Sequence, residues 1–130
     1  MNEVSIKGRF IAYEIRPAEA GGATPVGVFP NEITSAGVQR ILELMGGQSN
    51  EAWRAIRLVG SGGEFIERPV STEVKPGALV SNALFEAGDL AFDPVVIQMY
   101  SGTTKVAEAA FEVSGGRTLF VERVDELSKG

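Results

Sequence analysis

The hydrophobic positions of this chain fall into short segments in which apolar and polar residues alternate, a pattern that predicts β-strands. The first segment, residues 4–16, carries apolar side chains on both faces: Val4, Ile6, Phe10 and Ala12 on one, and Ile11, Tyr13 and Ile15 on the other. A strand that is apolar on both faces lies centrally in a sandwich or is partly covered by a partner. We therefore expect this strand to take one of these two places.

Further strands are expected wherever a similar apolar segment lies between turn residues. They fall at residues 26–29, 53–59, 70–74, 79–85, 95–100, 105–113 and 117–124. The segment from Pro17 to Pro25 predicts a hairpin-like loop, and residues 64–77 predict a long polar surface loop around the short strand at 70–74.

Two strands near the C-terminus are expected to pair directly. Ser114-Gly115-Gly116 separates residues 105–113 from residues 117–124, and a Gly-Gly pair between two strands is typical of a tight hairpin. Residues 125–130 are expected to fray or to dock on a neighbouring subunit.

One helix is predicted, over residues 35–45. Thr34 or Ser35 supplies an N-cap oxygen for the free N–H groups of the first turn. The apolar side chains of this segment follow helical spacing on one face: Val38, Ile41, Leu42 and Met45. Gly46 and Gly47 then end the helix, so we expect it to cover one opening of a sheet.

These elements together predict a mainly β fold, an antiparallel β-sandwich or jelly roll with one short helix. A length of 130 residues fits one domain, 1–130. The sixteen glycines and six prolines fit the many turns that such a fold needs.

Composition limits the catalytic and metal-binding chemistry that we expect, because the chain contains neither His nor Cys. These residues supply most nucleophile–base pairs, transition-metal ligands and proton shuttles that work at neutral pH. We therefore expect no enzymatic activity, no catalytic residue, no cofactor and no metal site.

Charge and hydropathy limit the classes of partner that we expect. The net charge is −5, from 17 acidic and 12 basic residues, and no basic stripe is present, which argues against nucleic-acid binding. The start of the sequence lacks the apolar core of a signal peptide, and no apolar run is long enough for a bilayer. We expect synthesis in a cytoplasm and no membrane partner.

Three local patterns hint at chemistry but are expected to be structural. Gly60-Ser61-Gly62-Gly63 lacks the Gly-Lys-Ser/Thr and the helix of a phosphate loop, so it predicts a turn. Glu86, Asp89 and Asp93 lie close in sequence, but their spacing matches no calcium loop, so a solvated acidic turn is expected. A glycosidase-like carboxylate pair or a Ser–Lys dyad is placed by no motif.

The single Trp, Trp53, stands in an apolar segment beside Ile56 and Leu58, which predicts a core position. A sugar-stacking platform is the functional alternative for this side chain. Arg54 and Arg57 are expected near the solvent face, where they are able to contact an acidic partner surface.

The segment Asn31-Glu32-Ile33-Thr34-Ser35-Ala36-Gly37, with the apolar helix and Gly46-Gly47 that follow it, resembles a recurrent segment of bacteriophage virion proteins. In that group, an N-x-I-T-x-x-G sequence opens a short apolar helix that ends in Gly. Later stretches of this chain resemble further segments of those proteins in the same order: residues 56–62, 68–71, 107–111 and 116–121. The likeness covers roughly residues 31–124 and rests on the order and spacing of these short pieces.

This resemblance implies a non-enzymatic structural protein of the virion, made in the host cytoplasm and present in symmetric copies. A capsid decoration or cement protein is expected ahead of a tail protein, since no fibre-like segment accompanies the domain. The implied partners are the major capsid protein or tail proteins and further copies of the chain itself. Aromatic side chains and Arg dominate the binding energy of such interfaces, so the expected contact residues are Phe10, Tyr13, Arg54, Arg57 and Tyr100.

Two alternatives to a virion protein remain open. A carbohydrate-binding or adhesin module would use Trp53, Tyr13 or Tyr100 as stacking platforms in an exposed aromatic row. A small glycosidase-like or calcium-dependent enzyme would need a cleft with paired carboxylates.

Overall fold

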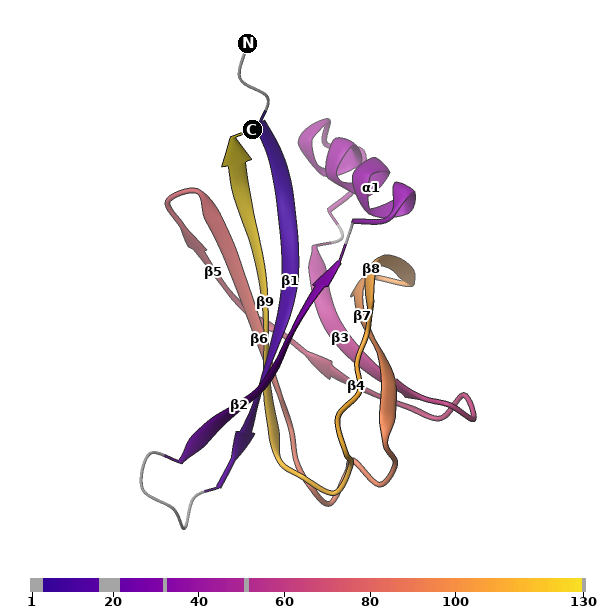
Figure 1. Cartoon of the computed structure of the whole chain (residues 1–130). Coiled ribbons are helices and arrows are strands. Elements are labelled where there is room, and N and C mark those ends of the chain that lie inside the picture. The colour runs from indigo at the N-terminus through magenta and orange to yellow at the C-terminus, as the bar shows by residue number, and fades with distance from the viewer. Residues whose placement is uncertain (1–3, 17–21, 32, 51, 130) are drawn as a thin grey trace.

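The computed structural model describes residues 4–16, 22–31, 33–50 and 52–129. Within them the chain forms nine strands and one helix (Figure 1). The elements are β1 Val4–Ile15, β2 Ala23–Asn31, α1 Ser35–Met45, β3 Trp53–Gly60, β4 Phe65–Pro69, β5 Ser71–Lys75, β6 Ala78–Phe85, β7 Pro94–Ser101, β8 Thr104–Ala110 and β9 Leu119–Lys129. Among these residues no helix is long and apolar enough to cross a bilayer.

The strands form two antiparallel sheets that face each other. The five-stranded sheet has the order β2-β1-β9-β6-β5, and the four-stranded sheet has the order β4-β3-β7-β8. The expected mainly β fold with one short helix is therefore confirmed, and the two sheets are consistent with a β-sandwich. The strand order does not confirm a jelly roll.

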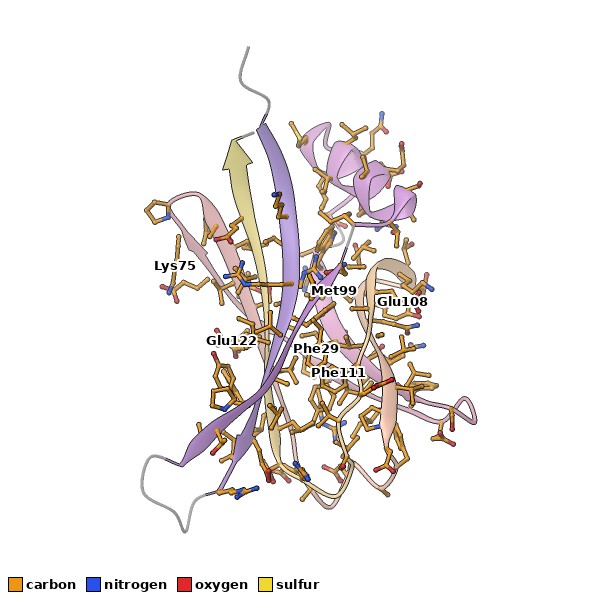
Figure 2. The ribbon with its side chains drawn as sticks, viewed as in Figure 1. Phe29, Lys75, Met99, Glu108, Phe111 and Glu122 are labelled. Carbon is orange, nitrogen blue, oxygen red and sulfur yellow. The ribbon has the colours of Figure 1, made fainter. Side chains whose placement is uncertain are left out.

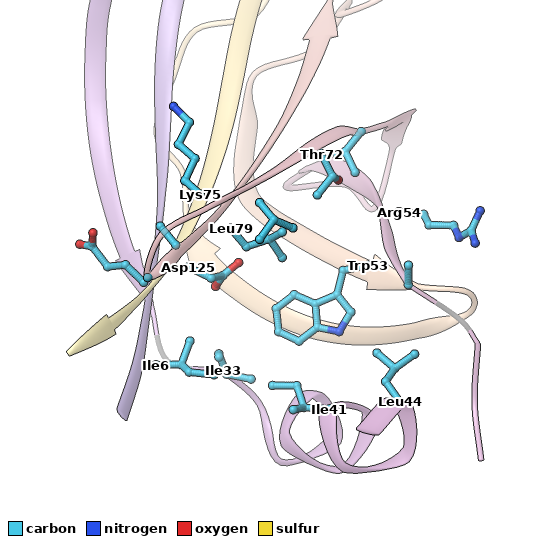
Figure 3. Close-up of a pocket in the computed structure, with 16 residues that line it drawn as sticks. Ile6, Ile33, Ile41, Leu44, Trp53, Arg54, Thr72, Lys75, Leu79 and Asp125 are labelled. Carbon is cyan, nitrogen blue, oxygen red and sulfur yellow. The ribbon is translucent and has the colours of Figure 1, made fainter. Parts of the chain in front are cut away.

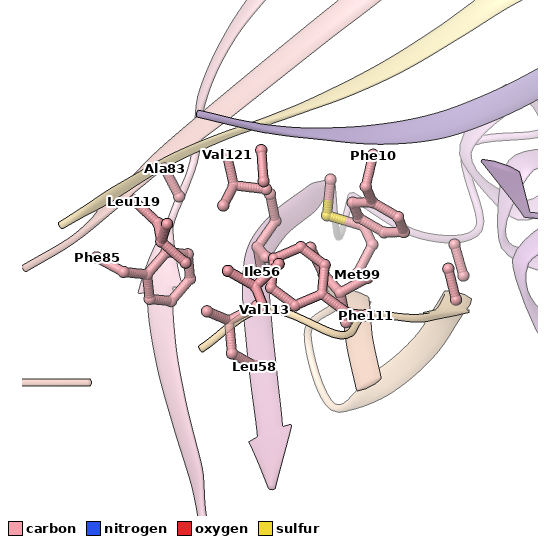
Figure 4. Packing of buried hydrophobic residues seen from close by; sticks show 14 of the residues in the cluster. Phe10, Ile56, Leu58, Ala83, Phe85, Met99, Phe111, Val113, Leu119 and Val121 are labelled. Atoms are coloured by element: carbon pink, nitrogen blue, oxygen red, sulfur yellow. The ribbon is translucent and has the colours of Figure 1, made fainter. Parts of the chain in front are cut away.

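The core lies between the two sheets and follows the period-two alternation of the sequence (Figure 4). Phe10 and Ala12 of β1 face Ile56 and Leu58 of β3 across the interior, and all four are fully buried. Phe29 and Phe111 pack with ring centroids 4.6 Å apart between the sheets, whereas Glu108 and Glu122 point outward (Figure 2). As expected, β1 is flanked on both sides, by β2 and β9.

The sandwich is joined along both of its long sides. At one side the chain passes from β4 through Val70 to β5, and thereby from the four-stranded to the five-stranded sheet. At the other side Ile33, just after β2, forms a bridge with Ala107 of β8. Both sheets are thus tied at their edges, and the openings lie at the two ends.

The expected hairpin between residues 105–113 and 117–124 is wrong. β8 pairs with β7 in one sheet, and β9 pairs with β1 and β6 in the other. The chain leaves the four-stranded sheet after Ala110 and crosses to the opposite sheet. A Cβ on Gly115 would lie 2.0 Å from the backbone oxygen of Phe92, so glycine is needed here for close chain approach rather than for a tight turn.

Other boundaries differ from the sequence interpretation because edge strands carry a weak apolar signal. Residues 64–77 contain two strands, β4 and β5, in place of a long loop with one strand. Both are edge strands whose side chains are largely exposed, so polar residues occupy much of them. β2 also extends beyond residues 26–29, and of the expected loop from Pro17 to Pro25, residues 17–21 lie outside the described residues.

The C-terminal segment is also a correction. Residues 125–129 continue β9 and pair with β1, so they are not a frayed tail. Asp125 is only 8% exposed. The alternation of inward positions continues past residue 124 through charged side chains, which the sequence pattern alone does not mark as buried.

The helix has the predicted bounds and the predicted cap. Thr34 Oγ1 accepts a hydrogen bond from the Gly37 N–H at 3.0 Å, and its backbone N–H donates to Val106 O at 3.1 Å. Gly37 lets the helix approach β8 closely, since a Cβ there would lie 2.3 Å from Val106 O. The helix is thereby fixed over one end of the sandwich (Figure 1).

The orientation of the helix differs from the expected one. Ile41 and Leu44 line the interior space beneath it, whereas Val38, Leu42 and Met45 are exposed by 50, 57 and 79%. The close contact at Gly37 turns the helix so that part of its apolar stripe faces away from the sheets. This end of the molecule therefore presents apolar side chains both inside and outside.

Candidate functional site

A pocket of about 740 Å³ lies at the α1 end, between the helix and the inner face of the five-stranded sheet (Figure 3). One wall comes from the sheet, and the opposite wall comes from the helix. The side chains that form most of its apolar surface are Ile6, Val74 and Leu79 from the sheet, Ile41 and Leu44 from α1, and Trp53 at the start of β3. A pocket of this volume is in the range of small-molecule sites in proteins.

Asp125, which lines the pocket, belongs to a buried ion pair with Arg123. Arg123 is fully buried, and its Nε and Nη2 donate to Asp125 Oδ1 at 3.0 and 2.8 Å. Its Nη1 donates to Asn31 Oδ1, and its guanidinium lies 4.6 Å from the centre of the Phe10 ring. A Cβ on Gly8 would lie 1.9 Å from Nη2, so the glycine leaves room for the guanidinium. A buried ion pair of this kind is stable only when its hydrogen-bonding groups are satisfied.

Two polar atoms of the pocket wall are not satisfied. Asp125 Oδ2 and Trp53 Nε1 are buried and have no hydrogen-bond partner within the described part of the protein. One is an acceptor and the other a donor, and both belong to residues that line the pocket. An unpaired buried polar atom costs about 1–3 kcal/mol, so native structures contain few of them.

The outer surface around this pocket is apolar as well. Five large apolar side chains near it are exposed: Ile6, Val38, Leu42, Met45 and Val74. A second hollow, lined by Pro30, Val38 and Leu42 among others, shares Ile6, Ile33 and Ile41 with the pocket. The two hollows thus adjoin each other, and we call the five exposed side chains around them the α1-end patch.

The five residues expected at an interface do not come together. Phe10 is fully buried in the core and offers no surface to a partner. Tyr13 is half-buried in the five-stranded sheet, with its ring centroid 6.3 Å from that of Phe120. Arg54 is exposed and lines the mouth of the pocket, whereas Arg57 and Tyr100 lie together on the four-stranded sheet.

Arg57 and Tyr100 form part of a stacked arrangement. The Arg57 guanidinium lies 4.1 Å from the centre of the Phe65 ring and 4.2 Å from that of the Tyr100 ring. It also pairs with Glu67 at 3.0 Å. These contacts engage both Arg57 and one face of the Tyr100 ring within the chain itself.

Trp53 has features of both roles considered from the sequence, a core residue and a binding residue. Its ring is half-buried and packs against the core cluster, as expected for a core residue. It also forms part of the pocket wall, and its Nε1 is without a partner there.

The acidic turn residues have partners of a structural kind. Asp89 pairs with Arg68 at 2.9 Å, and Asp93 accepts a hydrogen bond from the Gly115 N–H at 2.7 Å. Over the described ranges, no group of three or more carboxylates is arranged to hold a metal ion. The Gly60–Gly63 segment forms the turn between β3 and β4, with Gly63 at φ +88°.

The sequence did not reveal the Arg123–Asp125 pair or the pocket. A signal for the pair exists in hindsight, because Arg123 and Asp125 continue the inward alternation of Leu119 and Val121. Comparison with known protein families, with curated proteins and with solved structures found no match for this chain.

Proposed function

We propose that this protein is a non-enzymatic structural component of a bacteriophage particle, bound in multiple copies. A capsid decoration or cement protein is our first choice, ahead of a tail-associated protein. Its partners are then the major capsid protein or tail proteins and neighbouring copies of itself, and it is located in the virion after synthesis in the host cytoplasm.

The observation that carries this proposal is where the virion-like sequence lies in the fold. The segment from Asn31 to Gly47, which resembles the recurrent virion segment, builds the α1 end of the sandwich. Asn31 holds the buried Arg123, Thr34 caps the helix, and Gly37 brings it against β8. The residues of the resemblance therefore support the part of the molecule that exposes the α1-end patch.

A patch of this composition is suited to binding by buried area. Removing apolar surface from water stabilises a complex by about 25 cal/mol per Å², and exposed apolar patches mark interaction surfaces. The outward side chains of α1 make the helix apolar on two sides, which is typical of a helix that is covered on both. We assign the α1-end patch as the main contact with the particle, in place of the five dispersed residues expected from sequence.

The carbohydrate-binding alternative is less well supported. It requires an exposed row of aromatic side chains, but Tyr100 is stacked against Arg57 and Tyr13 lies on the other sheet. Trp53 forms part of the pocket wall, to which neither tyrosine contributes.

The test is quantitative mass spectrometry of purified particles from the lysate that yields this protein. A copy number comparable with that of the major shell protein supports a decoration protein, and a few copies per particle support a tail location. Absence of the chain from the particles contradicts the proposal.

A pair of variants then tests the assigned surface. Leu42→Glu places a charge in the α1-end patch, and Leu84→Glu places one at a similarly exposed position on the five-stranded sheet. We expect Leu42→Glu to abolish binding to particles that lack the protein and Leu84→Glu to leave it unchanged, with both variants folded by circular dichroism. Equal binding by the two variants would contradict the assigned surface while leaving the virion role to the mass spectrometry.

A further inference from the structure

The two atoms of the pocket residues that lack a hydrogen-bond partner restrict the chemistry of a ligand that would bind there. Asp125 is only 8% exposed, and its unpaired oxygen, Oδ2, needs a hydrogen-bond donor. Trp53 Nε1 needs an acceptor. Figure 3 shows both side chains among the apolar residues of the pocket, with Leu79 beside Asp125.

The ion pair beneath the pocket argues against a charged ligand. Arg123 donates two hydrogen bonds to Asp125 Oδ1, so the two charges offset each other inside the protein. A third charge brought into this space would lose its hydration. Arg54 and Lys75 also line the pocket, but both are exposed to water, which weakens their attraction for a charged ligand. The group that meets Asp125 Oδ2 is therefore an uncharged donor.

We propose that the pocket between α1 and the five-stranded sheet binds a small, uncharged, mostly apolar molecule that carries a hydroxyl group. The hydroxyl hydrogen is donated to Asp125 Oδ2, the unpaired acceptor of the pocket. The apolar remainder of the molecule packs between Leu79 on the sheet and Ile41 and Leu44 on the helix. The volume of about 740 Å³ gives room for such a molecule.

This site adjoins the α1-end patch and shares Ile6 and Val74 with it, but the two differ in chemistry. The patch is an outer surface suited to a protein partner, whereas the pocket has an enclosed donor and acceptor that an apolar protein surface would leave unpaired. The pocket proposal does not depend on the chain being part of a particle.

The single Trp gives a direct readout of occupancy. Because Trp53 is the only Trp and lies in the pocket wall, its fluorescence reports a ligand there without interference from other sites. The probes are 1-octanol and heptyl methyl ether, which have the same number of heavy atoms. The ether retains the acceptor oxygen but has no hydrogen to donate.

We expect 1-octanol to shift the Trp53 emission to shorter wavelength in a saturable way, with unchanged circular dichroism. Loss of a hydrogen bond to a charged group predicts about tenfold or greater weakening for the ether. Equal affinity of the two probes would contradict recognition by Asp125, and absence of a saturable shift with both would contradict the site.

Octanoate serves as the charged probe, since the exposed Arg54 and Lys75 both line the pocket. We expect octanoate to bind more weakly than 1-octanol. Tighter binding of octanoate would overturn the assignment of an uncharged ligand.

Two substitutions on β6 form a matched pair for the location. Leu79→Phe fills part of the pocket, and Leu84→Phe adds the same volume on an exposed position outside it. We expect octanol affinity to fall about tenfold or more in the first and to stay within about twofold of wild type in the second. Equal affinities in the two folded variants would place the ligand elsewhere, and if Leu79→Phe does not fold, the two wild-type probes still decide the question.

Discussion

The two ends of the sandwich each hold a buried carboxylate on the inner face of the five-stranded sheet, but the two carboxylates differ in how many of their oxygens accept hydrogen bonds. Glu14, at the end opposite α1, uses both oxygens: Arg16 donates to each at 2.9 Å, and Arg117 donates to Oε1 at 3.2 Å. Asp125, at the α1 end, uses only Oδ1, and Oδ2 has no partner among the described residues.

The packing of the two ends also differs: the Glu14 end is closely packed, whereas the α1 end is not. At the Glu14 end, the chain crosses between the sheets with the Gly116 N–H bonded to Leu90 O at 2.7 Å, and Leu90 is fully buried. At the α1 end, a pocket separates the helix from the sheet, and apolar side chains are exposed around it. The Glu14 end is thus closely packed with its carboxylate fully paired, whereas the α1 end keeps an unpaired carboxylate oxygen, a pocket and exposed apolar side chains. Such a difference is typical of proteins in which a binding site is less stable than the rest of the fold.

The largest effect is expected from breaking the ion pair at the α1 end. Arg123→Met leaves the Asp125 carboxylate buried without its counter-charge and should lower the free energy of unfolding by about 3–5 kcal/mol. Urea denaturation measures this change. The double variant Arg123→Met/Asp125→Leu removes both charges and should recover most of the loss, so a double variant as unstable as the single one would contradict this explanation.

Next comes a pair of leucine truncations, one at each end. Leu119 is fully buried near Glu14, and Leu119→Ala should lower the free energy of unfolding by about 2–5 kcal/mol, because the closely packed neighbours cannot close the cavity. Leu79→Ala, in the half-buried pocket wall, should cost roughly 1 kcal/mol, since this side chain already borders open space. Thermal and urea unfolding measure both, and equal losses would remove the contrast between the ends.

The close crossing at the Glu14 end gives a smaller effect. Gly115→Ala should cost about 1–3 kcal/mol, because a Cβ would press on the Phe92 carbonyl and the backbone must shift. Gly88→Ala is the control, since a Cβ there meets nothing within 4 Å and its φ is not positive. Urea denaturation should show the control unchanged; a neutral Gly115→Ala would mean that the crossing is loosely packed.

The Glu14 ion pairs predict a dependence of stability on pH. The hydrogen bond from Arg16 lowers the pKa of Glu14, with the nearby Arg117 acting in the same direction. Because the pKa is lower in the folded state, the stabilisation is complete above the unfolded pKa and is lost as pH falls through the folded pKa. Glu14→Gln should therefore flatten the fall in stability below about pH 5.

Unfolding followed over a pH series measures this effect. Arg16→Gln, which removes the leading cause of the shift, should flatten the same part of the profile to a smaller extent. If both variants keep the wild-type slope, the ion pairs of Glu14 do not contribute to stability.

The sequence predicted the elements better than their connections. The alternation around Phe10 and Ile56, and the cap at Thr34, are local signals, and the strands and helix that they predict are present. Gly115-Gly116 predicts a hairpin turn, but a close crossing of two chain segments also requires glycine, and this is the role that Gly115 has in the structure. Which strands pair depends on contacts between distant segments, and these leave no local pattern in the sequence.

The candidate site was the least predictable part. Arg123 and Asp125 are charged, and charged residues are almost never fully buried unless they are paired, so their burial follows only once β9 is paired on both sides. The exposure of Leu42 and Met45 likewise depends on how Gly37 seats the helix on β8. Both features arise from tertiary packing, which overrides the local apolar pattern.

The central claim, that the α1 end binds and the Glu14 end does not, is tested most directly by heteronuclear NMR during titration with 1-octanol. The single Trp gives one indole N–H signal, which reports the unpaired donor of the pocket. We predict a saturable shift of this signal together with the backbone amides of Leu44 and Leu79, while the amides of Glu14 and Arg117 stay in place. Shifts spread evenly over both ends, or an indole signal that does not move, would contradict the account.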